Sequence, residues 1–231
     1  MKHYLTGLIM AALLLPTTAT LCQADLLWNQ DPADWGKFSS ASHYQSWTAD
    51  DFMLDTASEI TTVSWWGGRG GDTPVIDGFH IRFYSDGIDA ATGQHFADQL
   101  LLEEIISGDA GQTSYNSETY SYSATLSTAF TAVANQHYWL SIQADTQHDP
   151  NDPWWGWQES PTTYLNPAEF NGHHYSHHPI NQSPFYHGNH DMAFALDGTP
   201  TPVPEPATLL LFGTGLVGVI GMGRKRQTTS G

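Results

Sequence analysis

The sequence contains very little cysteine and very little positive charge. Its 231 residues include one cysteine, Cys22, and seven lysine or arginine residues against 24 acidic residues. A lone cysteine excludes an intramolecular disulfide, so packing or a bound metal ion has to stabilise the fold. The formal net charge of −17 at pH 7 repels phosphate backbones, which excludes nucleic acid as an expected partner.

The few basic residues are concentrated near the chain ends. Between Asp25 and Pro200 there are three, Lys37, Arg69 and Arg82, against 23 acidic residues. A surface this acidic favours binding of divalent cations or of neutral, hydroxyl-rich partners. The same charge is also explained by the need to keep a secreted protein soluble.

The sequence also lacks the motifs of common enzyme classes. It contains no Gly-x-Ser-x-Gly elbow and no His-Glu-x-x-His pair, and the glycine-rich run 67–71 is not followed by Lys-Ser/Thr. Many carboxylates are present, but no spacing singles out the acid and nucleophile of a glycosidase. We therefore expect a non-catalytic protein, with a glycan-cleaving hydrolase as an alternative.

The N-terminus has the pattern of a secretion signal. A short positive start at residues 1–3 precedes an apolar run from Leu5 to Leu15, which is too short to span a bilayer stably, and small residues follow at Cys22 to Ala24. The pattern predicts a signal helix in residues 1–24 that is removed, so that the mature chain begins at Asp25.

The C-terminus has three parts in a fixed order: a Pro-Glu-Pro motif, an apolar stretch from Ala207 to Gly223, and a basic cluster. About 17 residues at about 1.5 Å each reach roughly 25 Å, which is enough for a thin membrane crossing. The basic cluster keeps the end of the chain in the cytoplasm. The pattern predicts a Pro-rich linker at 199–206, a transmembrane helix with its basic cluster at 207–226 and a tail at 227–231.

This arrangement resembles the PEP-CTERM sorting signal, although an ordinary single-pass anchor would share its apolar stretch. The resemblance implies processing by an exosortase in a Gram-negative envelope, transient anchoring in the inner membrane, and delivery of the domain to the cell surface or the exopolysaccharide matrix. The residues that carry it are Pro204, Glu205, Pro206, Arg224, Lys225 and Arg226.

The region between the two ends, residues 25–198, reads as a single all-β domain. Short segments with β-branched or aromatic residues and partial alternation are separated by turn-forming sequences, among them Ser85-Asp86-Gly87. Eight strands at this spacing predict a two-sheet β-sandwich, jelly-roll-like in its connections. The predicted strands are 47–54, 59–66, 78–85, 100–107, 119–126, 138–144, 154–159 and 192–196.

Several motifs in this domain resemble a secreted β-sandwich module of PEP-CTERM and other bacterial surface proteins. They include Ala49-Asp50-Asp51-Phe52, Trp65-Trp66-Gly67, Tyr138-Trp139-Leu140-Ser141-Ile142, Trp155-Gly156-Trp157 and Asp191-Met192-Ala193-Phe194. The resemblance supports the fold and implies no particular activity.

A first candidate site is a set of aromatic side chains that could stack on sugar rings. Adjacent tryptophans in a strand point to opposite faces, so one of each pair is expected in the core and the other at the surface. The candidate glycan-binding residues are Trp65, Trp66, Trp154, Trp155, Trp157 and Tyr164.

A second candidate site is the histidine-rich segment that contains His173, His174, His177 and His178. Neutral imidazoles bind zinc, copper or nickel well, but no fixed ligand spacing recurs. A transition-metal site and a solvated polar loop both remain open for this segment.

A third candidate site consists of acids near the first and last predicted strands: Asp50, Asp51, Asp191 and Asp197. Carboxylates and loop carbonyls from both ends of the chain could hold a calcium ion and replace the missing disulfides. Turn capping explains the same aspartates without a metal, so no cofactor is certain.

These observations favour a non-catalytic exported protein that contacts extracellular polysaccharide through exposed aromatics. A surface metal-binding protein that uses the histidine segment is the main alternative.

Overall fold

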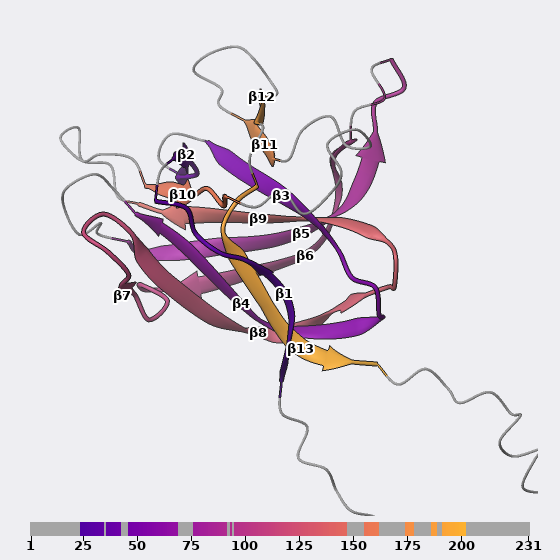
Figure 1. Cartoon of the computed structure of the whole chain (residues 1–231), viewed down its shortest axis with the longest axis horizontal. Helices are drawn as coiled ribbons and strands as arrows, with labels where there is room; N and C mark the ends of the chain where they lie inside the picture. The colour runs from indigo at the N-terminus through magenta and orange to yellow at the C-terminus, as the bar shows by residue number, and fades with distance from the viewer. Residues whose placement is uncertain are drawn as a thin grey trace, which may run out of the picture.

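Figure 1 shows the fold of the chain in a computed structural model. The structure describes residues 24–34, 36–42, 46–68, 76–91, 93, 95–146, 155–161, 174–177, 186–188 and 191–201. Residues 1–23 and 202–231 lie outside this part, and with them the predicted signal, most of the linker, the apolar stretch and the basic cluster. Among the described residues, none belongs to a helix long and apolar enough to span a membrane.

The described elements are β strands arranged in two sheets, as the sequence predicted for a β-sandwich. The jelly-roll order of the connections stays a prediction. In the first sheet, β13 lies between β1 and β4, and β4 also pairs with β8 and β10. Its strands are β1 (Asp25–Gln30), β2 (Lys37–Ser39), β4 (Ser58–Gly68), β7 (Thr113–Ser114), β8 (Tyr120–Ala132), β10 (Gly156–Gln158) and β13 (Phe194–Pro200).

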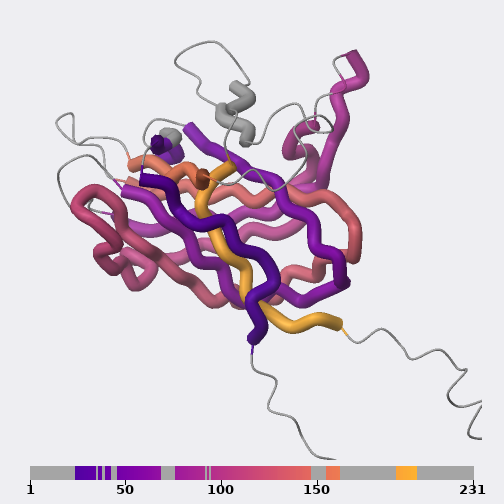
Figure 2. The backbone as a smooth tube through the Cα atoms, in the orientation of Figure 1, coloured from indigo at the N-terminus to yellow at the C-terminus, as the bar shows by residue number. Residues whose placement is uncertain are grey.

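The second sheet has the order β12-β11-β3-β9-β5-β6. Figures 1 and 2 show its strands β9, β5 and β6 running behind those of the first sheet, with the β5–β6 hairpin extending away from the body of the molecule. Its strands are β3 (Trp47–Met53), β5 (Gly78–Ile88), β6 (His95–Ser107), β9 (His137–Asp145), β11 (His174–His177) and β12 (Tyr186–Gly188).

The core lies between the two sheets and is rich in aromatic rings. In β5, the alternate residues Phe79, Ile81 and Phe83 are all fully buried, as the period of a strand requires. Phe83 stacks on Phe130 of the opposite sheet with ring centroids 4.3 Å apart, and Phe79 meets Trp65 at 4.9 Å. These contacts close the sandwich without a disulfide.

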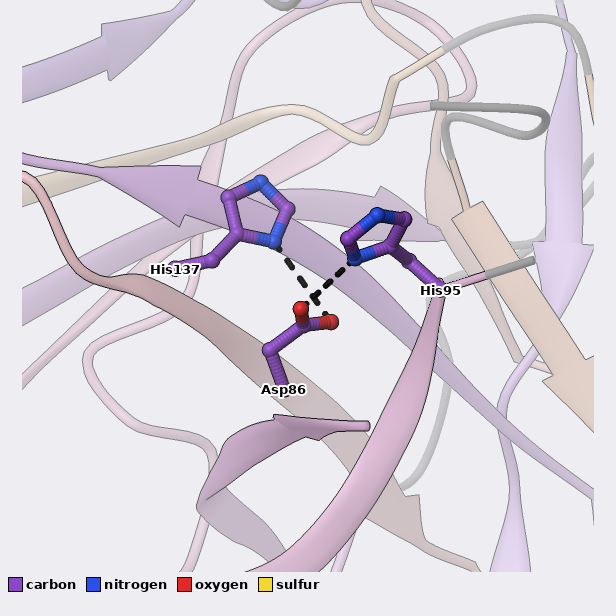
Figure 3. Close-up of side chains that lie close together, drawn as sticks. All are labelled: Asp86, His95 and His137. Carbon is purple, nitrogen blue, oxygen red and sulfur yellow. Dashed lines mark hydrogen bonds and ion pairs between the residues drawn. The ribbon is translucent and has the colours of Figure 1, made fainter. Parts of the chain in front are cut away.

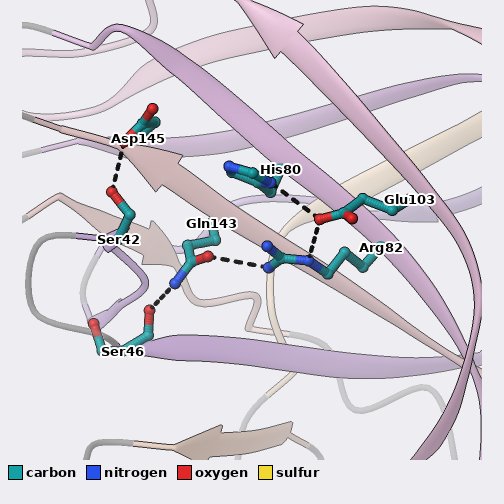
Figure 4. Close-up of polar contacts among 7 residues, drawn as sticks. All are labelled: Ser42, Ser46, His80, Arg82, Glu103, Gln143 and Asp145. Carbon is teal, nitrogen blue, oxygen red and sulfur yellow. Dashed lines mark hydrogen bonds and ion pairs between the residues drawn. The ribbon is translucent and has the colours of Figure 1, made fainter.

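The outward face of β5 carries polar side chains (Figure 4). Arg82 Nε donates to Glu103 Oε1 at 2.7 Å, and His80 Nδ1 lies 3.0 Å from the same oxygen. Arg82 Nη1 also donates to Gln143 on β9, whose Nε2 donates to the Ser46 carbonyl at 2.7 Å. The network ties β6, β5, β9 and the residue before β3 together across the sheet.

Several strand limits differ from the prediction; β6, for example, begins at His95 instead of residue 100, and β8 extends to Ala132 instead of residue 126. Ser85, Asp86 and Gly87 were predicted to form a turn, but β5 runs through them and pairs with β6 across two register shifts, so that prediction is wrong. β1 was not predicted, because its apolar residues directly follow the signal-like segment. β13 ends two residues after the predicted boundary at Gly198, and Thr199 and Pro200 pair with β4.

β1 and β13 bring the two ends of the domain together. Asp25 lies opposite Gly198 in an antiparallel ladder that continues to the pair Gln30 and Phe194. β13 is therefore hydrogen bonded to β1 along one edge and to β4 along the other.

Candidate functional site

The best-defined polar cluster of the described residues lies on the outer face of the second sheet. It combines Asp86 near the end of β5, His95 at the start of β6 and His137 at the start of β9 (Figure 3). Tyr138 and Phe52 point into the core, so strand alternation turns their neighbours His137 and Asp51 to the outer face.

Local irregularity in the β5–β6 ladder brings His95 over this face. The ladder shifts register between Phe83 and Asp86, and such bulges bend a strand and redirect its side chains. Gly87 permits the close approach, because a Cβ atom there would lie 2.7 Å from the ring of Phe96.

The three side chains offer metal-ligand atoms that all lie within 4.8 Å of one another. His95 Nδ1 lies 2.6 Å from Asp86 Oδ2, and His137 Nδ1 lies 3.6 Å from Asp86 Oδ1. Trp139 Nε1 donates to Asp86 Oδ1 at 2.9 Å. The Asp86 carboxylate is thus the common partner of the two imidazoles.

Asp51 supports the cluster from behind. Its Oδ2 lies 2.8 Å from His137 Nε2, and both side chains are largely buried, with 4% and 9% exposed. When a carboxylate accepts a hydrogen bond from one ring nitrogen of a histidine, the other ring nitrogen points to the opposite side. In His137 this second nitrogen points toward Asp86. This pairing of carboxylate and imidazole is common behind metal-ligating histidines.

The charges of the cluster reinforce one another. Burial alone lowers the pKa of His137, but hydrogen bonds with Asp51 and then Asp86 outweigh it and raise that pKa to about 9. Burial alone raises the pKa of Asp86, but contacts with His137, Trp139 and His95 outweigh it and lower that pKa. In the metal-free protein, His137 is therefore a cation held between two carboxylates.

A pocket opens beside the cluster. It has a volume of about 480 Å³ and is lined by Ser85, Asp86, His137 and the β8–β9 turn at 133–136. Asn135 in this turn adopts a positive φ of 56°, which asparagine tolerates better than most residues. Two imidazoles and a carboxylate next to an open space are a donor set for zinc or another divalent transition metal, with room for a further ligand.

The predicted aromatic site is largely absent as a surface. Trp65, Trp155 and Trp157 are fully buried, so they cannot stack on a sugar, and this part of the prediction is corrected. Their indoles fill the core instead: Trp155 Nε1 donates to the Tyr122 hydroxyl and Trp157 Nε1 to the Ala193 carbonyl. Trp154 and Tyr164 lie outside the described residues.

Trp66 is the exception among the predicted aromatics. It is half-buried and points away from Trp65, as the alternation of a strand requires. Its ring centroid lies 6.4 Å from that of Tyr115, whose side chain is 51% exposed. These two rings form a small aromatic surface on the first sheet.

The four predicted calcium ligands do not form one group. Asp50 and Asp191 come together in the interior, where the amide of Met192 donates to Asp50 Oδ2 at 2.8 Å. Asp51 faces the opposite way, toward His137. Asp197 lies in β13 opposite Leu26 and Thr62, away from the other three, so its inclusion in one site is wrong.

The histidine segment is described only in part. His174 and His177 belong to β11, where they pair with Asp50 and Trp47 of β3, while His173 and His178 lie outside the described residues. The sorting residues Pro204, Glu205, Pro206, Arg224, Lys225 and Arg226 also lie outside.

Sequence reasoning missed Asp86, His95 and His137. They are separated by 9 and 42 positions in the chain, and no motif connects them. The available signal was weak: Asp86 and His137 directly flank predicted strands, whereas His95 lies five residues before the predicted strand 100–107. These positions gain meaning only once β5, β6 and β9 are known to be neighbours.

Comparison with known families gives two matches. A family described as a domain of unknown function, DUF7901, matches residues 26–197. The PEP-CTERM protein-sorting motif matches residues 202–226. No curated protein matches the chain significantly.

Proposed function

Because the chain belongs to the DUF7901 family and ends in a PEP-CTERM sorting motif, we propose that it is a non-catalytic surface or matrix protein that binds a divalent transition metal. The motif marks an exported protein whose C-terminal region is processed by an exosortase. Its location on the surface or in the matrix, its binding of a metal ion and its lack of catalysis are parts of our proposal.

The observation that carries the metal proposal is the convergence of Asp86, His95 and His137 beside an open pocket. The donor set of two imidazoles and one carboxylate suits zinc, copper or nickel better than calcium or magnesium. Asp51 already holds His137 in the orientation that a metal-ligating imidazole needs. Outside the cell, no cytoplasmic thiol pool competes for such an ion.

Calorimetric titration of the full-length protein with zinc, copper and nickel tests this proposal. His95→Ala and His137→Ala are expected to abolish high-affinity binding. His80→Ala is the matched control, because His80 lies on the same sheet but contacts Glu103 instead of the cluster. Unchanged binding in the first two variants overturns the proposed centre.

The histidine segment is the competing metal site, and the same titration separates the two. A variant in which His173, His174, His177 and His178 are replaced by alanine is expected to keep its high-affinity zinc binding. Loss of binding in that variant alone assigns the metal to the segment and contradicts the Asp86 centre.

A second candidate function is contact with extracellular polysaccharide, favoured by the neighbouring rings of half-buried Trp66 and exposed Tyr115. Stacking on a sugar ring needs an aromatic face with access to solvent, and the exposed Tyr115 ring and the partly exposed Trp66 ring are the candidates for it. Retardation in gels that contain the producer's exopolysaccharide is expected to be lost in Trp66→Ala. It is expected to persist in Leu101→Ala, an exposed apolar control on the other sheet.

The proposed destination and the absence of catalysis have their own tests. Fractionation of the native host is expected to find the domain on the cell surface or in the matrix, with the precursor passing through the inner membrane. Incubation with candidate polysaccharides is expected to release no reducing ends, and release that depends on a carboxylate of this chain would assign a hydrolase instead.

A further inference from the structure

A second polar cluster lies inside the sandwich, on the opposite face of β3 from the proposed metal centre. It consists of Asp50 on β3, Gln30 at the end of β1 and Asp191 just before β13. Their exposed fractions are 0%, 1% and 3%. Carboxylates are rarely buried so completely unless a cation or a proton neutralises them.

Hydrogen bonds connect the three residues. The backbone amide of Met192 donates to Asp50 Oδ2 at 2.8 Å, which brings the adjacent Asp191 close to Asp50. Gln30 Nε2 donates to Asp191 Oδ2 at 3.3 Å. The Asp191 carbonyl accepts from the Ser160 amide at 2.7 Å. Segments from both ends of the domain therefore meet at this point.

Two oxygen atoms of the cluster lack donors. Asp50 Oδ1 and Gln30 Oε1 are buried and have no hydrogen-bond partner among the described residues. An acceptor left unsatisfied in the interior destabilises the fold, and more so when the group is charged. Burial and the neighbouring carboxylates of Asp191 and Asp51 also raise the pKa of Asp50 well above its usual range.

We propose that Asp50, Asp191 and Gln30 hold a calcium ion between the two sheets. All three offer oxygen, and a hard cation such as Ca²⁺ prefers carboxylate and amide oxygens to nitrogen. A divalent charge balances the two carboxylates and supplies the partner that Asp50 Oδ1 and Gln30 Oε1 lack. Because the ligands come from β1, β3 and the segment just before β13, the ion links parts of both sheets.

This calcium site is independent of the transition-metal centre. Asp50 and Asp51 are neighbours in β3 but point to opposite faces, so each belongs to a different site. Failure of the zinc proposal leaves the calcium proposal untouched, since neither His95 nor His137 takes part in it.

Thermal unfolding of the full-length protein after chelator treatment tests the site with calcium alone as the probe. Calcium at a hundredfold excess over Kd is expected to raise Tm by roughly 5–10 °C. Asp50→Asn, which keeps the shape and removes the charge, is expected to abolish this rise. Asp197→Asn is the matched control and is expected to keep it, as is His95→Ala.

The alternative is that Asp50 carries a proton. In that case calcium leaves the Tm of the unmodified protein unchanged, and this result overturns the proposal. Should Asp50→Asn fail to fold, the calcium content of the unmodified protein after gel filtration decides: one tightly held ion per chain supports the site, and none contradicts it.

Discussion

His137 Nε2 lies 2.8 Å from Asp51 Oδ2, while Nδ1 of the same ring lies 3.6 Å from Asp86 Oδ1. The imidazole therefore bridges β3 and β5, the two strands on either side of its own strand β9. Asp51 orients the His137 ring by its contact with Nε2, so that Nδ1 is directed toward Asp86 beside the pocket.

Replacing Asp51 by asparagine is expected to weaken zinc binding about 10- to 100-fold, because loss of a carboxylate behind a ligating histidine has effects of this size. The pKa of His137, followed by NMR in the metal-free protein, is expected to fall below about 9 in the same variant. Asp55→Asn, at an exposed position after β3, serves as the control. Unaltered zinc affinity together with an unaltered His137 pKa would show that Asp51 does not orient the ring.

Zinc affinity is expected to increase with pH up to about 9. The raised pKa of His137 means that a proton occupies the imidazole at neutral pH, and the metal has to displace it. For one displaced proton, the affinity changes about tenfold per pH unit. Titrations at several pH values, in buffers of different ionisation enthalpy, measure both the slope and the proton release, and a flat profile contradicts His137 as a ligand.

Glu103→Gln is expected to reduce the dependence of stability on acid pH. The hydrogen bond with His80 and the Arg82 guanidinium lower the pKa of Glu103 in the folded protein (Figure 4). A lowered pKa stabilises the fold fully above the ordinary pKa of glutamate, and this contribution is lost as the pH falls through the lowered value. The effect is small because the side chain is 34% exposed.

Urea unfolding at a series of acid pH values measures this difference. Asp98→Asn, an exposed acid on the same strand, provides the comparison. If Glu103→Gln and the unmodified protein lose stability in parallel below pH 5, the Glu103 ion pair does not contribute.

Phe83→Ala is expected to destabilise the fold by about 3–5 kcal/mol, since it removes a fully buried ring that stacks on Phe130 across the sandwich. Ile88→Ala on the same strand is expected to change stability by less than about 0.5 kcal/mol, because Ile88 is 62% exposed. Chemical denaturation of both variants gives the comparison. Equal effects would mean that the two sheets do not pack as described.

The local sequence pattern was sufficient to predict the central strands and to predict which face of β5 packs into the core. Phe79, Ile81 and Phe83 alternate with polar residues, and a strand has a period of two, so the buried face follows directly. The same pattern could not show that β5 continues through Asp86 and Gly87. Those residues favour turns, and pairing with Ala97 and Phe96 of β6 keeps them extended.

Predicting the candidate sites was harder than predicting the strands, because the sites are formed by contacts between segments that are distant in the sequence. Strand alternation separates Trp65 from Trp66, but it cannot tell that Trp155 and Trp157 both face the core, since that depends on what packs against β10. Asp50 and Asp51 were grouped because both lie near the first predicted strand, whereas the sandwich divides them between its interior and its outer face.

The strand that leads to the sorting motif, β13, is held on both edges, by β1 and by β4. Tension on a C-terminus attached outside the cell would act along this strand, and its hydrogen bonds to both neighbours would share the load instead of opening one after another. Such shear geometry suits a module that has to withstand drag from moving water while fixed at one corner.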